Sequence, residues 1–164
     1  MSACRPGPAG GRRDAGAVTD AATLLHGTAI AVSGRAVLIR GASGAGKSDL
    51  ALRCLDHAAS PLLSGRPMLV ADDQVEIRRT GCRLRVLAPA TLRGLLEVRG
   101  IGIVSVASVA EAELALIVDL VGPEAVERLP STARTADILG LGLPLTAIWP
   151  FAASAPAKLL LALD

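Results

Sequence analysis

Aromatic side chains are nearly absent from this chain of 164 residues, which has one tryptophan, one phenylalanine and no tyrosine. The net charge is only +2, and the basic residues are scattered along the chain rather than clustered. Single-stranded nucleic acids are bound by aromatic platforms in basic grooves, and duplexes by basic patches. The composition therefore argues against a nucleic-acid partner.

Cysteines are also few, and the three present, Cys4, Cys54 and Cys82, are widely spaced and odd in number. Neither a disulfide framework nor a zinc motif has such spacing, and the pattern suits a reducing compartment. No apolar run reaches the ~18 residues that a membrane helix needs, and the N-terminus lacks the apolar core of a signal peptide. We expect a soluble, cytoplasmic protein without a membrane partner.

Apolar residues make up 51% of the chain, enough for a core of considerable size, and the length predicts one main domain. Residues 1–22 are rich in Gly, Pro, Ala and Arg and show no periodicity. Such composition predicts a disordered leader. Residues 23–164 are then the folded domain.

One segment matches the phosphate-binding loop pattern G-x-x-x-x-G-K-[ST]; it consists of Gly41, Ala42, Ser43, Gly44, Ala45, Gly46, Lys47 and Ser48. An apolar, strand-like run precedes it and a helical pattern follows it, which is the context in which this loop binds phosphates. The alternative is a glycine-rich turn between strand and helix that binds nothing. Fifteen of the 17 basic residues are arginine, so a lysine at this one position indicates a chemical requirement.

The chemistry of the loop follows from its residue types. Glycines let successive backbone N–H groups converge on phosphate oxygens, and the N-terminus of the following helix adds partial positive charge. Lys47 is expected to reach the β- and γ-phosphates, and the Ser48 hydroxyl to ligate Mg²⁺. The sequence predicts a site for a nucleoside triphosphate such as ATP.

Runs of consecutive strands elsewhere predict an α/β fold with a mixed β-sheet rather than a purely parallel one. Strands are expected at 28–33, 36–40, 68–71, 75–79, 83–87, 92–98, 101–104, 113–121 and 145–149, helices at 47–58 and 154–163, and a loop with a short helix at 123–130 and 133–140. Turn residues at 34–35 and 80–82 predict two hairpins.

Two acidic residues, Asp72 and Asp73, end a short apolar strand. Carboxylates at a strand end beside a phosphate loop can bind Mg²⁺. Because neighbouring side chains in a strand point to opposite faces, one acid could meet the metal and the other the phosphoryl acceptor. The alternative is a solvated turn, where aspartate is common.

A second polar pair, Glu97 and Arg99, is two residues apart in an apolar segment and is expected on one face of a strand. Glu97 could ligate Mg²⁺ and Arg99 could stabilise transferring phosphate charge, unless the two form only an exposed ion pair. His26, which precedes the first expected strand, is a candidate catalytic residue or a surface residue.

These segments together resemble the catalytic, C-terminal domain of HPr kinase/phosphorylase. The matching stretches, in the family's order, are His26-Gly27, the loop GASGAGKS, the acidic pair in VADD (70–73) and EVRGIGI (97–103). The resemblance implies a P-loop kinase with a fold similar to that of phosphoenolpyruvate carboxykinase. It also implies transfer of phosphate from ATP to a serine of HPr, the phosphocarrier of the sugar phosphotransferase system.

Residue roles carry over by the same resemblance. Lys47 would bind the nucleotide phosphates, and Ser48 and Glu97 would hold Mg²⁺. Asp73 would be the base that accepts the serine proton, with Asp72 beside it. His26 and Arg99 would be further active-site residues.

The chain departs from the family in two places. Only about 25 residues precede His26, so the chain resembles the shortened, catalytic-domain-only form of some proteobacteria. The family's arginine-rich P-V-R-P-G-R-N loop has no counterpart in residues 149–158, which contain no arginine. We therefore predict the kinase reaction and make no prediction of phosphorolysis. The family is hexameric, so the resemblance implies that this chain also forms a homo-oligomer, although the altered segment leaves the number of subunits open.

Two other functions remain as alternatives. One is a nucleotide-binding regulatory module that transfers no phosphate. The other is a small-metabolite kinase, which would be expected to have an arginine-rich lid that the sequence does not show. A GTPase is disfavoured because the guanine-specificity motif N-K-x-D is missing.

Overall fold

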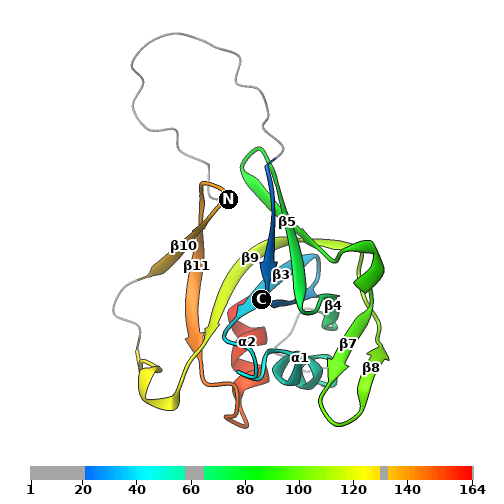
Figure 1. Cartoon of the computed structure of the whole chain (residues 1–164). Helices are drawn as coiled ribbons and strands as arrows, with labels where there is room; N and C mark the ends of the chain where they lie inside the picture. Colours follow the sequence, from blue (N-terminus) through cyan, green and yellow to red (C-terminus); the bar gives the residue numbers. More distant parts are fainter. Residues whose placement is uncertain (1–20, 58–64, 130–132, 164) are drawn as a thin grey trace.

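A computed structural model describes residues 21–57, 65–129 and 133–163 (Figure 1). Residues 1–20, the bulk of the predicted leader, lie outside this part of the chain, and Ala22 already belongs to the first strand. The division into a leader and a domain beginning at residue 23 stays a prediction.

A nine-stranded mixed sheet forms most of the molecule, in the order β1-β5-β6-β9-β3-β2-β4, with β11 pairing with both β9 and β10. Its strands are β1 (Ala22–His26), β2 (Thr28–Val32), β3 (Arg35–Arg40), β4 (Met68–Ala71), β5 (Gln74–Thr80), β6 (Arg83–Leu87), β9 (Glu111–Leu120), β10 (Arg134–Ile138) and β11 (Leu141–Ile148). Strands β3, β9 and β11 run parallel to one another, and the other pairings are antiparallel. The predicted mixed sheet is confirmed.

Two helices and a separate hairpin complete the fold. Helix α1 (Lys47–Leu55) follows β3, and helix α2 (Ala155–Leu163) follows β11. Strands β7 (Leu95–Val98) and β8 (Gly102–Ser105) pair only with each other, and Figure 1 shows their hairpin beside α1. Two short 3₁₀ helices, η1 (Ala90–Leu92) and η2 (Pro123–Ala125), lie in connections.

The curled sheet buries apolar side chains on both of its faces. Because side chains alternate along β3, Val37 and Ile39 pack toward α1 and α2, whereas Ala36 and Leu38 pack into a second cluster with β5 and β6. All four are fully buried. Burial on both faces explains why β3 reads as an unbroken apolar run, and it fixes the strand that leads into the phosphate loop.

The structure confirms both predicted hairpins and corrects two regions. Residues 133–140, expected as loop and short helix, contain strand β10, which pairs antiparallel with β11. Its turn, Leu139-Gly140, has positive φ at both residues (52° and 76°), a geometry normally marked by Asn-Gly or Asp-Gly. Strand β1 was not expected, and His26 ends it rather than preceding the first strand.

Candidate active site

The predicted phosphate loop connects β3 to α1. Gly44 and Gly46 have φ of 77° and 93°, a left-handed conformation that favours glycine. Gly46 is the N-cap of α1, and a Cβ added there would lie 3.2 Å from the ring of Phe151. Helix α1 therefore starts immediately after the loop, and its first backbone N–H groups have no acceptors within the helix.

Lys47 folds back over the loop. Its Nζ donates hydrogen bonds of 3.0 Å to the carbonyl oxygens of Gly41 and Ala42, and the residue is only 7% exposed. An ammonium group has three donors, so these two bonds leave one N–H for an anion. The loop thus holds a buried positive charge in a fixed position at its centre.

Asp72 is a buried carboxylate, 5% exposed, that ties three elements together. Its Oδ1 accepts hydrogen bonds from the hydroxyls of Thr28 in β2 (2.7 Å) and Ser48 in α1 (2.9 Å). Its Oδ2 accepts the backbone N–H of Glu97 in β7 (3.1 Å). The Ser48 hydroxyl, predicted to ligate a metal, is therefore oriented by a carboxylate.

Asp73 differs from its neighbour in exposure and backbone conformation. Its side chain is 63% exposed, and its φ of 66° is uncommon for a residue with a Cβ. The His26 Nδ1 lies 3.0 Å from the Asp73 carbonyl oxygen and 3.2 Å from its Oδ1. The Gly27 N–H also donates to that carbonyl, at 3.1 Å. These contacts hold Asp73 in a strained conformation with its carboxylate in solvent.

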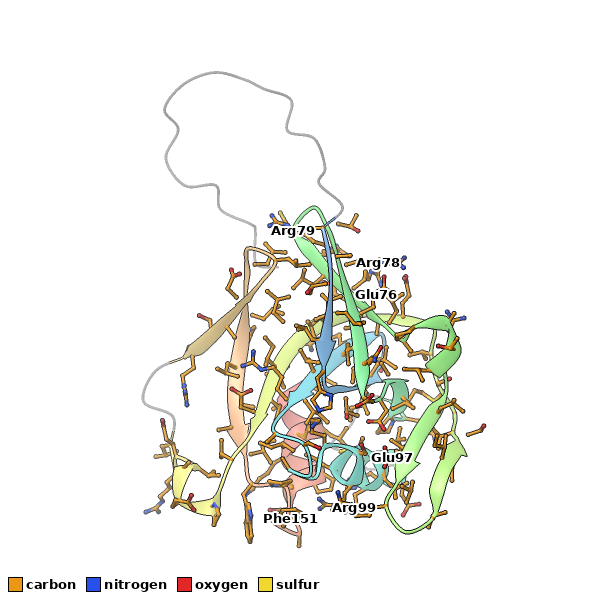
Figure 2. The ribbon with its side chains drawn as sticks, in the orientation of Figure 1. Glu76, Arg78, Arg79, Glu97, Arg99 and Phe151 are labelled. Carbon is orange, nitrogen blue, oxygen red and sulfur yellow. The ribbon has the colours of Figure 1, made fainter. Side chains whose placement is uncertain are left out.

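Both acids lie in the bend between β4 and β5 rather than within a strand, so strand alternation does not describe them. Glu97 is in β7, but that strand ends at Val98, and the expectation that Arg99 shares a strand face with Glu97 is wrong. Arg99 is in the β7–β8 turn. Figure 2 shows Glu97, Arg99 and Phe151 at the end of the molecule where α1 lies, far from Arg78 and Arg79.

One cavity of about 370 Å³ unites most of the predicted residues. Its lining includes His26, Ser43, Gly44, Gly46, Lys47, Ser48, Asp72, Asp73, Glu97 and Arg99. Gly41, Ala42 and Ala45 belong to the loop but do not line the cavity. The lining also contains Thr28 and Phe151, which the sequence analysis did not assign to the site. Nothing in the sequence marks Thr28, whereas the rarity of aromatic residues was a usable signal for Phe151.

The donor set suits a metal ion that is shared with phosphate. Within residues 21–57, 65–129 and 133–163, no three His, Cys, Asp or Glu side chains are grouped so that they could hold a metal ion. Mg²⁺ in phosphoryl-transfer sites is held by one or two carboxylates together with substrate phosphates, and Ser48, Asp72 and Glu97 fit that pattern.

None of the helices in the described ranges is long and apolar enough to cross a bilayer.

Comparison with known proteins gives the same family from sequence and from structure. The family model described as HPr Serine kinase C-terminal domain matches residues 19–160. The chain is 39% identical over 137 residues to an HPr kinase/phosphorylase of Exiguobacterium sp., covering 77% of this chain and 42% of the relative. It is 41% identical over 130 residues to that of Bordetella avium, covering 73% and 40%. The chain thus spans about two fifths of the length of these relatives.

A solved structure agrees with these matches. The Hpr(Ser) kinase/phosphatase from Coxiella burnetii superposes with a TM-score of 0.69 at 27% identity, covering 84% of this chain and 91% of that one. This similarity confirms the P-loop kinase fold that the sequence predicted for the chain. With a family model matching most of its length and a phosphate loop facing an acidic pair, the chain belongs to the HPr serine kinase C-terminal domain family.

Proposed function

We propose that this chain is an ATP- and Mg²⁺-dependent kinase that phosphorylates a serine of an HPr-type phosphocarrier protein. Family membership supports the reaction class, and the carrying observation is the contrast between the two aspartates. Asp72 is buried and bonded to Ser48 of the phosphate loop, whereas Asp73 is exposed in the same cavity. One carboxylate is positioned to act on the nucleotide side and the other on the acceptor side.

In this proposal the triphosphate lies on the loop amides, with the remaining N–H of Lys47 directed to the β- and γ-phosphates. Ser48, Asp72 and Glu97 hold Mg²⁺, which neutralises charge on those phosphates when bound. The Asp72 carboxylate keeps the Ser48 hydroxyl pointing toward itself, so the oxygen lone pairs of Ser48 face the cavity.

Transfer then proceeds by attack of the serine oxygen on the γ-phosphorus. The bond to the β–γ bridging oxygen breaks, ADP leaves, and the serine proton passes to the Asp73 carboxylate. His26 acts as a positioning residue, because it fixes both the backbone and the carboxylate of Asp73. Arg99, next to Gly44, supplies positive charge at the transferred group. Since the reactants are ATP and a phosphocarrier protein, we place the reaction in the cytoplasm.

The test is incubation of the chain with γ-labelled ATP, Mg²⁺ and purified HPr, with wild type compared with Asp73→Asn. Loss of a general base costs roughly 10²- to 10⁴-fold in rate, so label on HPr serine should fall by at least ~100-fold. Asp137→Asn in β10, which does not line the cavity, is the matched control and should keep full transfer.

Each other outcome has a definite meaning. If ATP binds but HPr stays unlabelled, the proposal fails and the chain is a nucleotide-binding module or acts on another acceptor. If Asp73→Asn transfers as fast as wild type, the assigned base is wrong. The proposal concerns the forward reaction; adding inorganic phosphate to labelled HPr tests the reverse one. Sedimentation of the pure chain tests the homo-oligomer that the family resemblance implies.

A further inference from the structure

The two aromatic residues of the chain lie two positions apart in the turn between β11 and α2. Trp149 is 37% exposed and Phe151 is 60% exposed, so neither is a core residue. The turn is closed by a hydrogen bond from the Ala152 N–H to the Trp149 carbonyl and is tied to α1 by one from Arg53 to the Pro150 carbonyl. The one tryptophan and the one phenylalanine of the sequence thus both lie on an exposed turn that is anchored to α1.

This turn adjoins the phosphate loop. The ring of Phe151 lies 3.2–3.3 Å from the position of a Cβ on Gly46, and it lines the same cavity as Lys47. The acids Asp72 and Asp73 line another part of that cavity. The Pro150-Phe151 turn follows β11, whereas the acids follow β4, and these strands lie on opposite sides of β3 in the sheet order.

That arrangement gives a direction to a nucleotide bound as proposed above. If the γ-phosphate points to the acids after β4, the nucleoside leaves the loop on the opposite side, over the ends of β9 and β11. These ends are level with the end of β3, because Arg40 pairs with Asp119 and Leu120 pairs with Ile148. Ligands of sheets with parallel strands bind outside the carboxyl ends of the strands.

A second pocket, of about 260 Å³, lies at this place. It is lined by Pro123 and Val126 after β9, by Ala147, Ile148, Trp149 and Ala152 around the end of β11, and by Lys158 of α2. The side chains that line it are apolar except for one indole N–H and one ammonium group, which can donate to ring nitrogens or to ribose oxygens. A flat heteroaromatic ring with acceptor atoms fits this chemistry, since bases stack on aromatic side chains.

We propose that this pocket, with Trp149 as its stacking surface, is the subsite for the base and ribose of the nucleotide whose phosphates occupy the loop. The inference rests on the proposed function, because it takes the direction of the nucleotide from the acidic pair. Phe151, which lines the phosphate-loop cavity two residues after Trp149, then contacts the ribose.

The experiment uses the emission of Trp149, the only tryptophan of the chain. The full chain is titrated with Mg·ATP and, separately, with Mg²⁺ and inorganic tripolyphosphate. ATP should change the intensity or wavelength of the emission, and tripolyphosphate should leave it nearly unchanged although it binds the loop. Equal responses to both ligands would overturn the proposal.

Variants give the affinity test. Trp149→Ala should raise the Kd for ATP roughly tenfold, the scale of one lost stacking contact, and leave the Kd for tripolyphosphate within about twofold. Trp149→Phe should restore most of the affinity. Leu161→Ala, an exposed apolar residue of α2 outside the pocket, is the matched control and should bind as wild type does. Calorimetry supplies both constants without depending on fluorescence.

The outcomes separate this inference from the proposed function. If Trp149→Ala binds ATP as tightly as wild type while HPr is still labelled, the subsite is wrong and the kinase assignment stands. If Trp149→Ala weakens ATP and tripolyphosphate equally, the residue supports the loop and not the base, and the subsite is again wrong. If wild type binds no ATP, both proposals fail.

Discussion

Replacing Asp72 by asparagine should leave the fold nearly as stable as wild type but remove most of the stabilisation that Mg·ATP gives. Asp72 is 5% exposed and accepts three hydrogen bonds, from Thr28, Ser48 and the Glu97 backbone. The asparagine oxygen can keep both hydroxyl bonds, but the amide NH₂ then faces the Glu97 N–H. One lost bond with an unsatisfied donor costs about 1–3 kcal/mol.

A second effect opposes that cost, because the substitution also removes a negative charge from a buried position. The free energy of unfolding of Asp72→Asn should therefore lie within about 2 kcal/mol of wild type, with part of the hydrogen-bond loss offset. Asp72→Ala removes both acceptor oxygens, and with them all three hydrogen bonds, and leaves the fully buried Thr28 hydroxyl without this partner. Its cost should be about 3–6 kcal/mol, a large share of the roughly 5–15 kcal/mol that stabilises a typical domain.

The assay is urea unfolding followed by circular dichroism, with and without Mg·ATP. Ligand at 100 times its Kd stabilises the folded state by about 2.7 kcal/mol, and wild type should show a shift of that order. Asp72→Asn should unfold near the wild-type midpoint without ligand but gain little from Mg·ATP. The reasoning is refuted if Asp72→Asn unfolds as early as Asp72→Ala, or if Mg·ATP stabilises Asp72→Asn as much as it stabilises wild type.

Two further predictions concern residues outside this network. Burial raises the pKa of the Cys54 thiol from 9.0 to about 12. Iodoacetamide at pH 8 should therefore modify the exposed Cys82 in the folded protein and Cys54 only after unfolding. Peptide mass spectrometry measures both modifications. The unfolded thiol ionises first as the pH rises, so the contribution of Cys54 to stability is fully present below pH 9 and is lost as the pH rises toward 12. Gly46→Ala should lower the free energy of unfolding by more than Gly81→Ala. Both glycines have positive φ, so the backbone strain of an alanine should cost ~1–2 kcal/mol at each position. Only at Gly46 does the new Cβ also meet a neighbour, the ring of Phe151. Equal midpoints in urea for the two alanine variants would contradict the contact.

Elements with local signals were predictable from the sequence. The phosphate loop and α1 follow from glycine and lysine spacing, and the β5–β6 hairpin from Gly81. Strand β10 was missed because its turn carries Leu139 where asparagine or aspartate would have marked it, and because its register exists only against β11. Strand β1 was missed for a similar reason, since its half-exposed residues are ordered by pairing with β5. Both strands form because they pair with segments elsewhere in the chain, and a local sequence pattern does not reveal such pairing.

Within the candidate site, residue identity was easier to predict than geometry. The acidic pair and Glu97 were found from their positions beside the loop pattern, and all of them line the cavity. The positive φ of Asp73 was not predicted: aspartate is compatible with this conformation, but the contacts with His26 and Gly27 that hold it come from residues that lie 47 and 46 positions away. Phe151 reaches Gly46 across more than a hundred residues, a contact that only the sheet order creates.

The bonding of Asp72 links assembly of the site to completion of the fold. Its three donors come from β2, α1 and β7, elements that are separated in sequence. A buried carboxylate is tolerable only when such donors are in place, so the β4–β5 bend, the start of α1 and the β7–β8 hairpin must dock together. Docking also fixes Asp73, which is the next residue, and brings Glu97 to the cavity. The groups that we propose to hold Mg²⁺ and to accept the serine proton are therefore positioned by the same interactions that close this edge of the protein. A partly docked hairpin would abolish the proposed phosphate transfer rather than change its selectivity.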